Sequence, residues 1–119
     1  MRPENRDGAF LWDMIQACRD ILDFASHKTF QDFENDKMLR SAVERQILIL
    51  GEAARNISDS LKQRTPQIPW KLIIAQRNIL AHEYGEVLTE RIWNVVQHRI
   101  PELLGQLQAL LPSPPTGTD

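Results

Sequence analysis

The stretch from Asp36 to Lys62, DKMLRSAVERQILILGEAARNISDSLK, carries a long apolar pattern. Apolar or small residues recur in it every three or four positions, which places their side chains on one face of an α-helix. These residues are Leu39, Val43, Ile47, Leu50, Ala53, Ala54, Ile57 and Leu61. The pattern predicts one long amphipathic helix over 36–62, with its apolar face turned toward a core.

A helix with the same spacing is predicted before this stretch. Its apolar positions are Leu11, Met14, Ile15, Cys18, Leu22 and Ala25. We expect it to end near Ser26. Thr29 or Asn35 can cap the helix that follows, because their side-chain oxygens accept hydrogen bonds from unpaired N–H groups at a helix start.

Residue types that start, end or break helices divide the second half of the chain into shorter predicted helices. Pro69 suits the first turn of a third helix, where a missing N–H costs no hydrogen bond, and Gly85 suits the end of that helix. Thr89 offers a cap for a fourth helix. Pro101 is expected to break or kink the fourth helix before a last helical segment.

No segment shows the alternation of apolar and polar residues that is typical of half-buried strands. We therefore predict an all-α fold, an antiparallel bundle of four to five helices. The 119 residues match the size of one domain, which we place at residues 1–111. Residues 112–119, PSPPTGTD, have no apolar periodicity and are expected to form a disordered tail.

Composition and charge narrow the class of protein. Cys18 is the only cysteine, so no internal disulfide is possible, and no apolar run is long enough for a membrane span. We expect a cytoplasmic protein without membrane contact. The net charge of −2 argues against a general polyanion binder, but residues 37–77 hold eight basic and three acidic side chains. This basic middle is either a phosphate-attracting surface or solvated helix surface.

The segment Arg77–Tyr84, RNILAHEY, gathers residue types suited to RNA cleavage by the 2′-hydroxyl. That reaction needs proton transfer to and from oxygen and a group that stabilises extra negative charge on phosphorus. Histidine transfers protons near neutral pH because its unperturbed pKa is about 6.5, which suits His82. Arginine donates two hydrogen bonds to two phosphate oxygens, which suits Arg77. The scheme requires no metal ion.

The spacing of Arg77 and His82 sets a condition on such a site. Five residues correspond to roughly 140° around an intact helix, so the two side chains converge only if the helix ends or distorts near His82. A second copy of the chain could also complete the site, and a twofold dimer would supply two histidines. If these two residues have no catalytic role, Arg77 is a surface arginine and His82 is a histidine at the end of a helix.

Three segments together show a family resemblance. They are AVERQILILGEA (42–53), WKLIIAQRNILAHEY (70–84) and the later Ile92-Trp93 with IPEL (100–103). They resemble the HepT-like branch of the HEPN superfamily, over roughly residues 10–110. The resemblance implies a helical bundle that dimerises, with arginine and histidine of both chains lining a cleft. It also implies an endoribonuclease that needs no metal and is the toxin of a toxin–antitoxin pair.

The resemblance also assigns residues and a partner. Arg77 and His82 match the catalytic positions, and Asn78 matches a polar residue that helps to place phosphate. Tyr84 matches a tyrosine to which a minimal nucleotidyltransferase antitoxin, MntA, transfers AMP from ATP. Added AMP would block access and repel RNA. Glu52 is a further supporting or RNA-binding candidate, which either pairs with an arginine near the site or faces solvent.

Other candidate sites have simpler structural explanations. Cys18 lies on an apolar helix face, so a buried thiol is favoured over a nucleophile. Trp12, Trp70 and Trp93 could stack on bases, but their apolar neighbours favour packing. No histidine has partners at metal-ligand spacing, and no glycine-rich phosphate loop is present, so this chain is expected to hold no metal or cofactor.

RNA, MntA and a second copy of the chain are therefore the expected partners, and DNA is not. Two other functions stay open. The chain could be a non-catalytic helical adaptor that a nucleotidyltransferase binds and modifies, or a dimeric scaffold in which Arg77 and His82 are structural.

Overall fold

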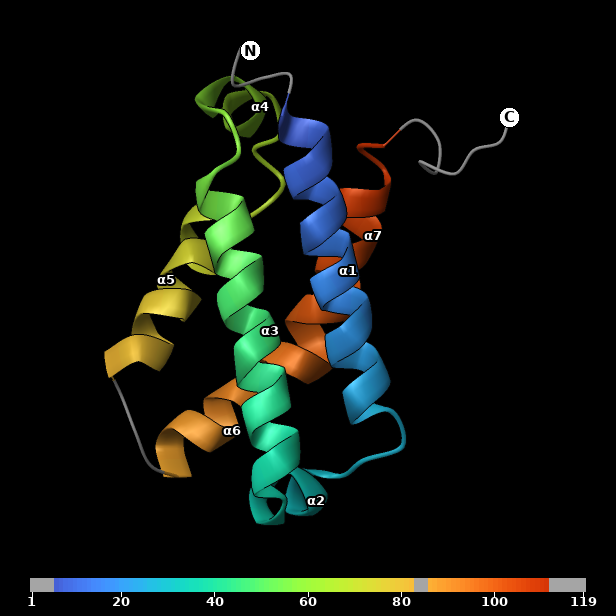
Figure 1. Cartoon of the computed structure of the whole chain (residues 1–119), viewed down its shortest axis with the longest axis vertical. Helices are drawn as coiled ribbons and strands as arrows, with labels where there is room; N and C mark the ends of the chain where they lie inside the picture. Colours follow the sequence, from blue (N-terminus) through green and yellow to red (C-terminus); the bar gives the residue numbers. More distant parts are fainter. Residues whose placement is uncertain (1–5, 83–85, 112–119) are drawn as a thin grey trace.

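The computed structural model describes residues 6–82 and 86–111, and this part of the chain is helical and contains no strand. Its elements are α1 (Asp7–Ala25), α2 (Phe30–Asn35), α3 (Lys37–Arg55), α4 (Asp59–Arg64), α5 (Trp70–His82), α6 (Glu86–Asn94), the π-helical turn η2 (Val95–Arg99) and α7 (Ile100–Gln108). The elements α1, α3, α5 and the stretch from α6 to α7 run in alternating directions (Figure 1). The predicted all-α antiparallel bundle is confirmed; Gly85 and the tail at 112–119 lie outside the described residues.

The prediction of one unbroken helix over 36–62 is wrong, because α3 ends at Arg55 and α4 begins at Asp59. Ser58 caps α4, since its hydroxyl oxygen accepts a hydrogen bond from the backbone N–H of Leu61 at 3.2 Å. Short polar side chains compete with the helical backbone for such bonds. The apolar pattern continues across the break because Ile57 and Leu61 are both buried.

Two other helix starts also follow from capping side chains. Thr29 and Asp32 form a reciprocal capping box at the start of α2, with bonds of 2.9 Å and 3.1 Å. Asp36, and not Asn35, caps α3 by accepting from the N–H of Leu39. The predicted cap at Thr89 is wrong, because Thr89 lies inside α6, which is described from Glu86.

Pro101 lies in the first turn of α7, directly after the π-helical turn η2. The N–H of Ile100 donates to the carbonyl of Val95, one residue further back than in an α-helix. Helices change direction where a proline or a π-turn interrupts the regular hydrogen bonds. Figure 1 shows that α7 runs at an angle to α6, so the predicted kink is present.

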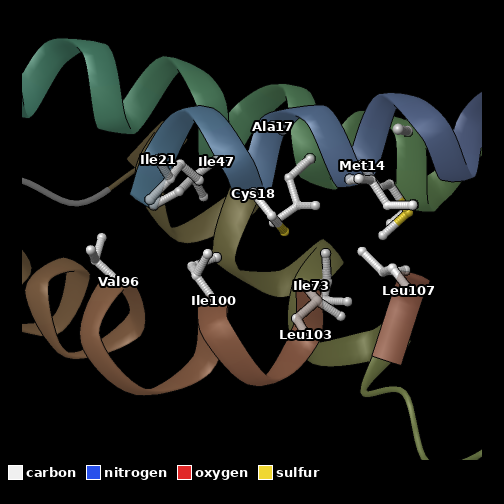
Figure 2. Packing of buried hydrophobic residues seen from close by; sticks show 14 of the residues in the cluster. Met14, Ala17, Cys18, Ile21, Ile47, Ile73, Val96, Ile100, Leu103 and Leu107 are labelled. Carbon is white, nitrogen blue, oxygen red and sulfur yellow. The ribbon is translucent and has the colours of Figure 1, made fainter. Parts of the chain in front are cut away.

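The core lies between α1 and the η2–α7 stretch, with α3 covering its side (Figure 2). Side chains of α1 point toward those of η2 and α7, and the closely packed ones are Met14, Cys18, Ile21, Val96, Ile100 and Leu107. All six are at most 1% exposed. Burial of this apolar surface is the main source of stability of the bundle.

A polar contact joins the start of α1 to the start of α4 at one end of the bundle. The carboxylate of Asp7, at the start of α1, accepts hydrogen bonds from the backbone N–H (2.9 Å) and the hydroxyl (2.6 Å) of Ser58. Both residues are buried, and a buried polar group is stable only when it is paired in this way. Asp7 therefore ties the start of α1 to the start of α4.

Candidate functional site

The start of α5 is fixed by hydrogen bonds to the preceding turn. The indole Nε1–H of Trp70 donates to the hydroxyl oxygen of Thr65 at 3.0 Å, and that hydroxyl donates to the carbonyl of Leu61 at 2.7 Å. The backbone N–H of Trp70 donates to the carbonyl of Ile68 at 2.8 Å. Trp70 and Thr65 are buried, so this network sets where α5, and with it Arg77, begins.

Gly51 is the point at which α5 comes closest to α3. A Cβ atom at Gly51 would lie 2.7 Å from the Cβ of Arg77 and 3.4 Å from the carbonyl oxygen of Ile73. Carbon atoms in contact lie about 3.5–4.0 Å apart, so any side chain at Gly51 would push the helices apart. The base of the Arg77 side chain is therefore packed directly on the α3 backbone.

Glu52, the next residue along α3, forms an ion pair with Arg77. The Glu52 Oε1 atom lies 3.5 Å from the Arg77 Nε atom. The Arg77 side chain is 35% exposed and that of Glu52 is 53% exposed. The pair is thus open to solvent, where such pairs stabilise a protein by only about 0.2–1 kcal/mol.

The remaining candidate residues lie on α5 or directly after it. Asn78 and His82 are residues of α5, and the structure describes their backbone but not their side chains. The structure describes α5 as far as His82, and the residues directly after it lie outside the described part, so the convergence of Arg77 and His82 stays a prediction. Tyr84 lies outside the described residues. Among the predicted site residues, the structure thus brings together Arg77 and Glu52.

Several alternative sites are explained by packing. Cys18 is fully buried, and burial raises the pKa of its thiol to about 12, so it is neutral at physiological pH. Trp93 packs on Phe33 with ring centroids 5.1 Å apart. Trp12 stacks under Arg19, with the guanidinium carbon 5.3 Å from a ring centroid. These tryptophans have intramolecular partners, as does Trp70.

The described residues leave an open hollow of about 530 Å³ at the turn before α5, with a lining that includes Asp59, Lys62 and Lys71, and a much smaller cavity inside the bundle. The cavity between α3, α5, η2 and α7 has a volume of about 40 Å³ and a largely apolar lining, whereas ligand pockets hold roughly 300–1,000 Å³. Within residues 6–82 and 86–111, no group of three His, Cys, Asp or Glu side chains could hold a metal ion. In this same part of the chain, every helix is too short or too polar to cross a membrane.

Sequence reasoning missed the roles of Gly51 and Thr65. Glycine within a helix is less favourable than alanine by about 1 kcal/mol, so a glycine inside a strong helical pattern signals a close contact. Gly51 carried that signal. The bond between Thr65 and Trp70 had no comparable signal, because the turn between them sets its geometry.

The comparisons with known proteins agree on one family. The family model described as "Ribonuclease HepT-like" matches residues 14–110. The chain is 34% identical over 110 residues to "Probable ribonuclease HepT" of Thermococcus cleftensis, covering 92% of this chain and 98% of that protein. It is 33% identical over 100 residues to "Putative RNase MJ1380" of Methanocaldococcus jannaschii, covering 84% and 92%.

A third relative is similarly close. "Putative RNase TTE0752" of Caldanaerobacter subterraneus is 32% identical over 102 residues, covering 86% of this chain and 91% of that protein. No solved structure matches this chain. The matched region holds α3, α5 and the contact between Gly51 and Arg77. The chain therefore belongs to the HepT-like ribonuclease family.

Proposed function

We propose that this chain is an endoribonuclease that cleaves RNA without a metal ion, with Arg77 and His82 as its catalytic residues. The observation that carries the proposal is the placement of Arg77. Its base is packed on Gly51, so its origin is rigid, and 35% of its side chain is exposed, so a polymer can reach it. The family match, which spans both residues, and the relatives named as ribonucleases support the same activity.

The proposed reaction is a transesterification within the RNA. A base removes the proton of a 2′-hydroxyl, and the 2′-oxygen attacks the adjacent phosphorus. The bond from phosphorus to the 5′-oxygen breaks, and an acid gives that oxygen a proton. The products are a 2′,3′-cyclic phosphate and a 5′-hydroxyl, so no water is consumed and no redox partner is needed.

The residues divide this work by their chemistry. His82 moves the protons, and Arg77 stabilises the charge that develops on the phosphorane, where a positioned cation contributes most. Asn78 helps to place the phosphate. One histidine cannot easily be base and acid in the same step, so we propose a homodimer whose two copies of His82 share these roles.

We further propose that the enzyme is a toxin that a nucleotidyltransferase antitoxin of the MntA type silences. The antitoxin would transfer AMP from ATP to Tyr84, two residues after His82. AMP there adds bulk and a negative phosphate beside a site for a polyanion, so access and electrostatics both oppose RNA binding. Tyr84→Phe should then stay active in the presence of the antitoxin, whereas neutralisation equal to wild type would mean that the antitoxin works by binding alone.

The proposal is tested by the chemistry of the RNA ends. The purified chain is incubated with RNA and EDTA, and the products are analysed by mass spectrometry. We expect 2′,3′-cyclic phosphate ends, a loss of at least about 100-fold in rate for His82→Ala, and little change for His98→Ala, which removes an exposed histidine. Intact RNA from a protein whose mass shows no AMP would contradict the activity and favour the adaptor.

A further inference from the structure

The contact between α3 and α5 holds the Arg77 side chain at two points. At its base, the Cβ of Arg77 lies where a larger residue at position 51 could not fit. Further out, the Oε1 atom of Glu52 lies 3.5 Å from the Nε atom of Arg77. Gly51 and Glu52 are adjacent on α3, so one helix turn contacts both the base and the Nε atom of this arginine.

The planar guanidinium group gives this arrangement a chemical consequence. One of its edges is formed by Nε and a terminal nitrogen, and another by the two terminal nitrogens; each can donate to two oxygens of an anion. A carboxylate beside Nε restrains the first edge. The plane of the guanidinium group, and with it the direction of its other N–H groups, is then set in part by Glu52.

The charge of Glu52 opposes RNA binding. It places a carboxylate beside the cation that is to attract phosphate, and like charges repel at this range. The pair is also too exposed to add much stability. A role of Glu52 in cleavage therefore has to come from orienting Arg77 and not from attracting the substrate.

We propose that Glu52 is a positioning residue, whose carboxylate restrains the Nε edge of Arg77 and so helps to orient the guanidinium group toward the reacting phosphate. This inference rests on the proposed role of Arg77 in RNA cleavage. The proposal gives the Glu52 side chain two separate kinetic effects. Glu52 raises the rate of the chemical step through orientation, and it weakens ground-state binding through repulsion.

The first test measures kcat and KM for RNA cleavage in Glu52→Gln. We expect kcat to fall about tenfold, because misoriented catalytic groups lose rate, while KM stays the same or falls. Glu34→Gln removes the same charge from an exposed position on α2 and should change neither constant. A rise in KM with unchanged kcat would make Glu52 an RNA-binding residue and overturn the proposal.

A double-mutant comparison tests whether Glu52 acts through the guanidinium group. Lysine lacks an Nε edge, so Glu52→Gln should have little further effect on kcat in the Arg77→Lys background. Equal effects of Glu52→Gln in both backgrounds would contradict a role through Arg77. The shape of the pH–rate profile should also stay the same in Glu52→Gln; loss of its acidic limb would assign proton transfer to Glu52 instead.

A measurement without substrate separates this inference from the proposed activity. Restraint of Arg77 slows motion and solvent exchange at its Nε–H, which ¹⁵N–¹H spectra of the whole protein detect. We expect that signal to broaden or disappear in Glu52→Gln and to remain in Glu34→Gln. A signal that Glu52→Gln leaves unchanged would overturn the positioning role, whereas the expected change in a protein that cleaves no RNA would refute the activity alone.

Discussion

The contact between α1 and the η2–α7 stretch differs sharply from the contact between α3 and α5. The first is made of fully buried apolar side chains, as Figure 2 shows. Of the α5 side chains that the structure describes, only Trp70 and Ile73, at its start, are buried. Further along, Ile74 and Leu80 are only partly buried against the core, and Arg77 meets a glycine and a partly exposed glutamate of α3.

The difference shows how this bundle separates stability from chemistry. An apolar interface stabilises in proportion to the area it buries, and polar groups would only weaken it. A site for RNA needs charged groups that are reachable but fixed. The helix α5 meets this need because its start is anchored by Trp70 while the side chain of Arg77, further along, is partly exposed. Substitutions on the two contacts should therefore have different effects.

The largest effect on stability is expected on the apolar side. Ile21→Ala removes a fully buried side chain of α1 and should lower the free energy of unfolding by about 2–5 kcal/mol. Met38→Ala, at a position 83% exposed, should change it by less than about 0.5 kcal/mol. Urea denaturation measures both, and equal midpoints for the two variants would contradict the assigned core.

An intermediate effect is expected at the anchor of α5. Thr65→Val keeps the shape but leaves the buried Nε1–H of Trp70 without its acceptor, which should cost about 1–3 kcal/mol. Trp70→Phe removes the donor. The double variant should therefore lose less stability than the sum of the two single variants. Simple additivity in thermal denaturation would mean that the hydrogen bond does not anchor the helix.

A smaller effect, which should differ between the two sites, is expected from alanine substitution of two helical glycines. Gly105→Ala, with no atom within 4 Å of the new Cβ, should stabilise by about 0.5–1 kcal/mol, because alanine favours helix. At Gly51 the same gain is offset by a clash that costs about 1–3 kcal/mol, so Gly51→Ala should be neutral or destabilising. Stabilisation of Gly51→Ala equal to that of Gly105→Ala would contradict the close contact.

The fold could be read from the sequence because apolar spacing survives small irregularities of the backbone. The pattern from Leu39 to Leu61 identified the buried face, but it could not show the break at Asn56, since burial continues on both sides. The start of α6 was placed too late, at Thr89, because a threonine can either cap a helix or lie within one. The residues around it decide which.

The candidate site could be read only in part. Arg77 and His82 were found from their chemistry and from the family resemblance, and the roles of both stay predictions. The pairing of Glu52 with Arg77 depends on how closely two helices approach, which Gly51 sets. This close approach arises from packing between Gly51 and Arg77, which lie 26 positions apart in the sequence. Local residue spacing does not encode it.

The most direct test of the central claim compares two cations on α5. Arg77→Ala keeps the Cβ that touches Gly51, so the helix contact should survive, while Lys71→Ala removes an exposed cation from the same helix. With RNA and EDTA, we predict that Arg77→Ala cleaves at least about 100-fold more slowly than wild type, with a melting temperature lowered by no more than about 5 °C. Lys71→Ala should stay near the wild-type rate. Cleavage by Arg77→Ala at the wild-type rate would contradict the account.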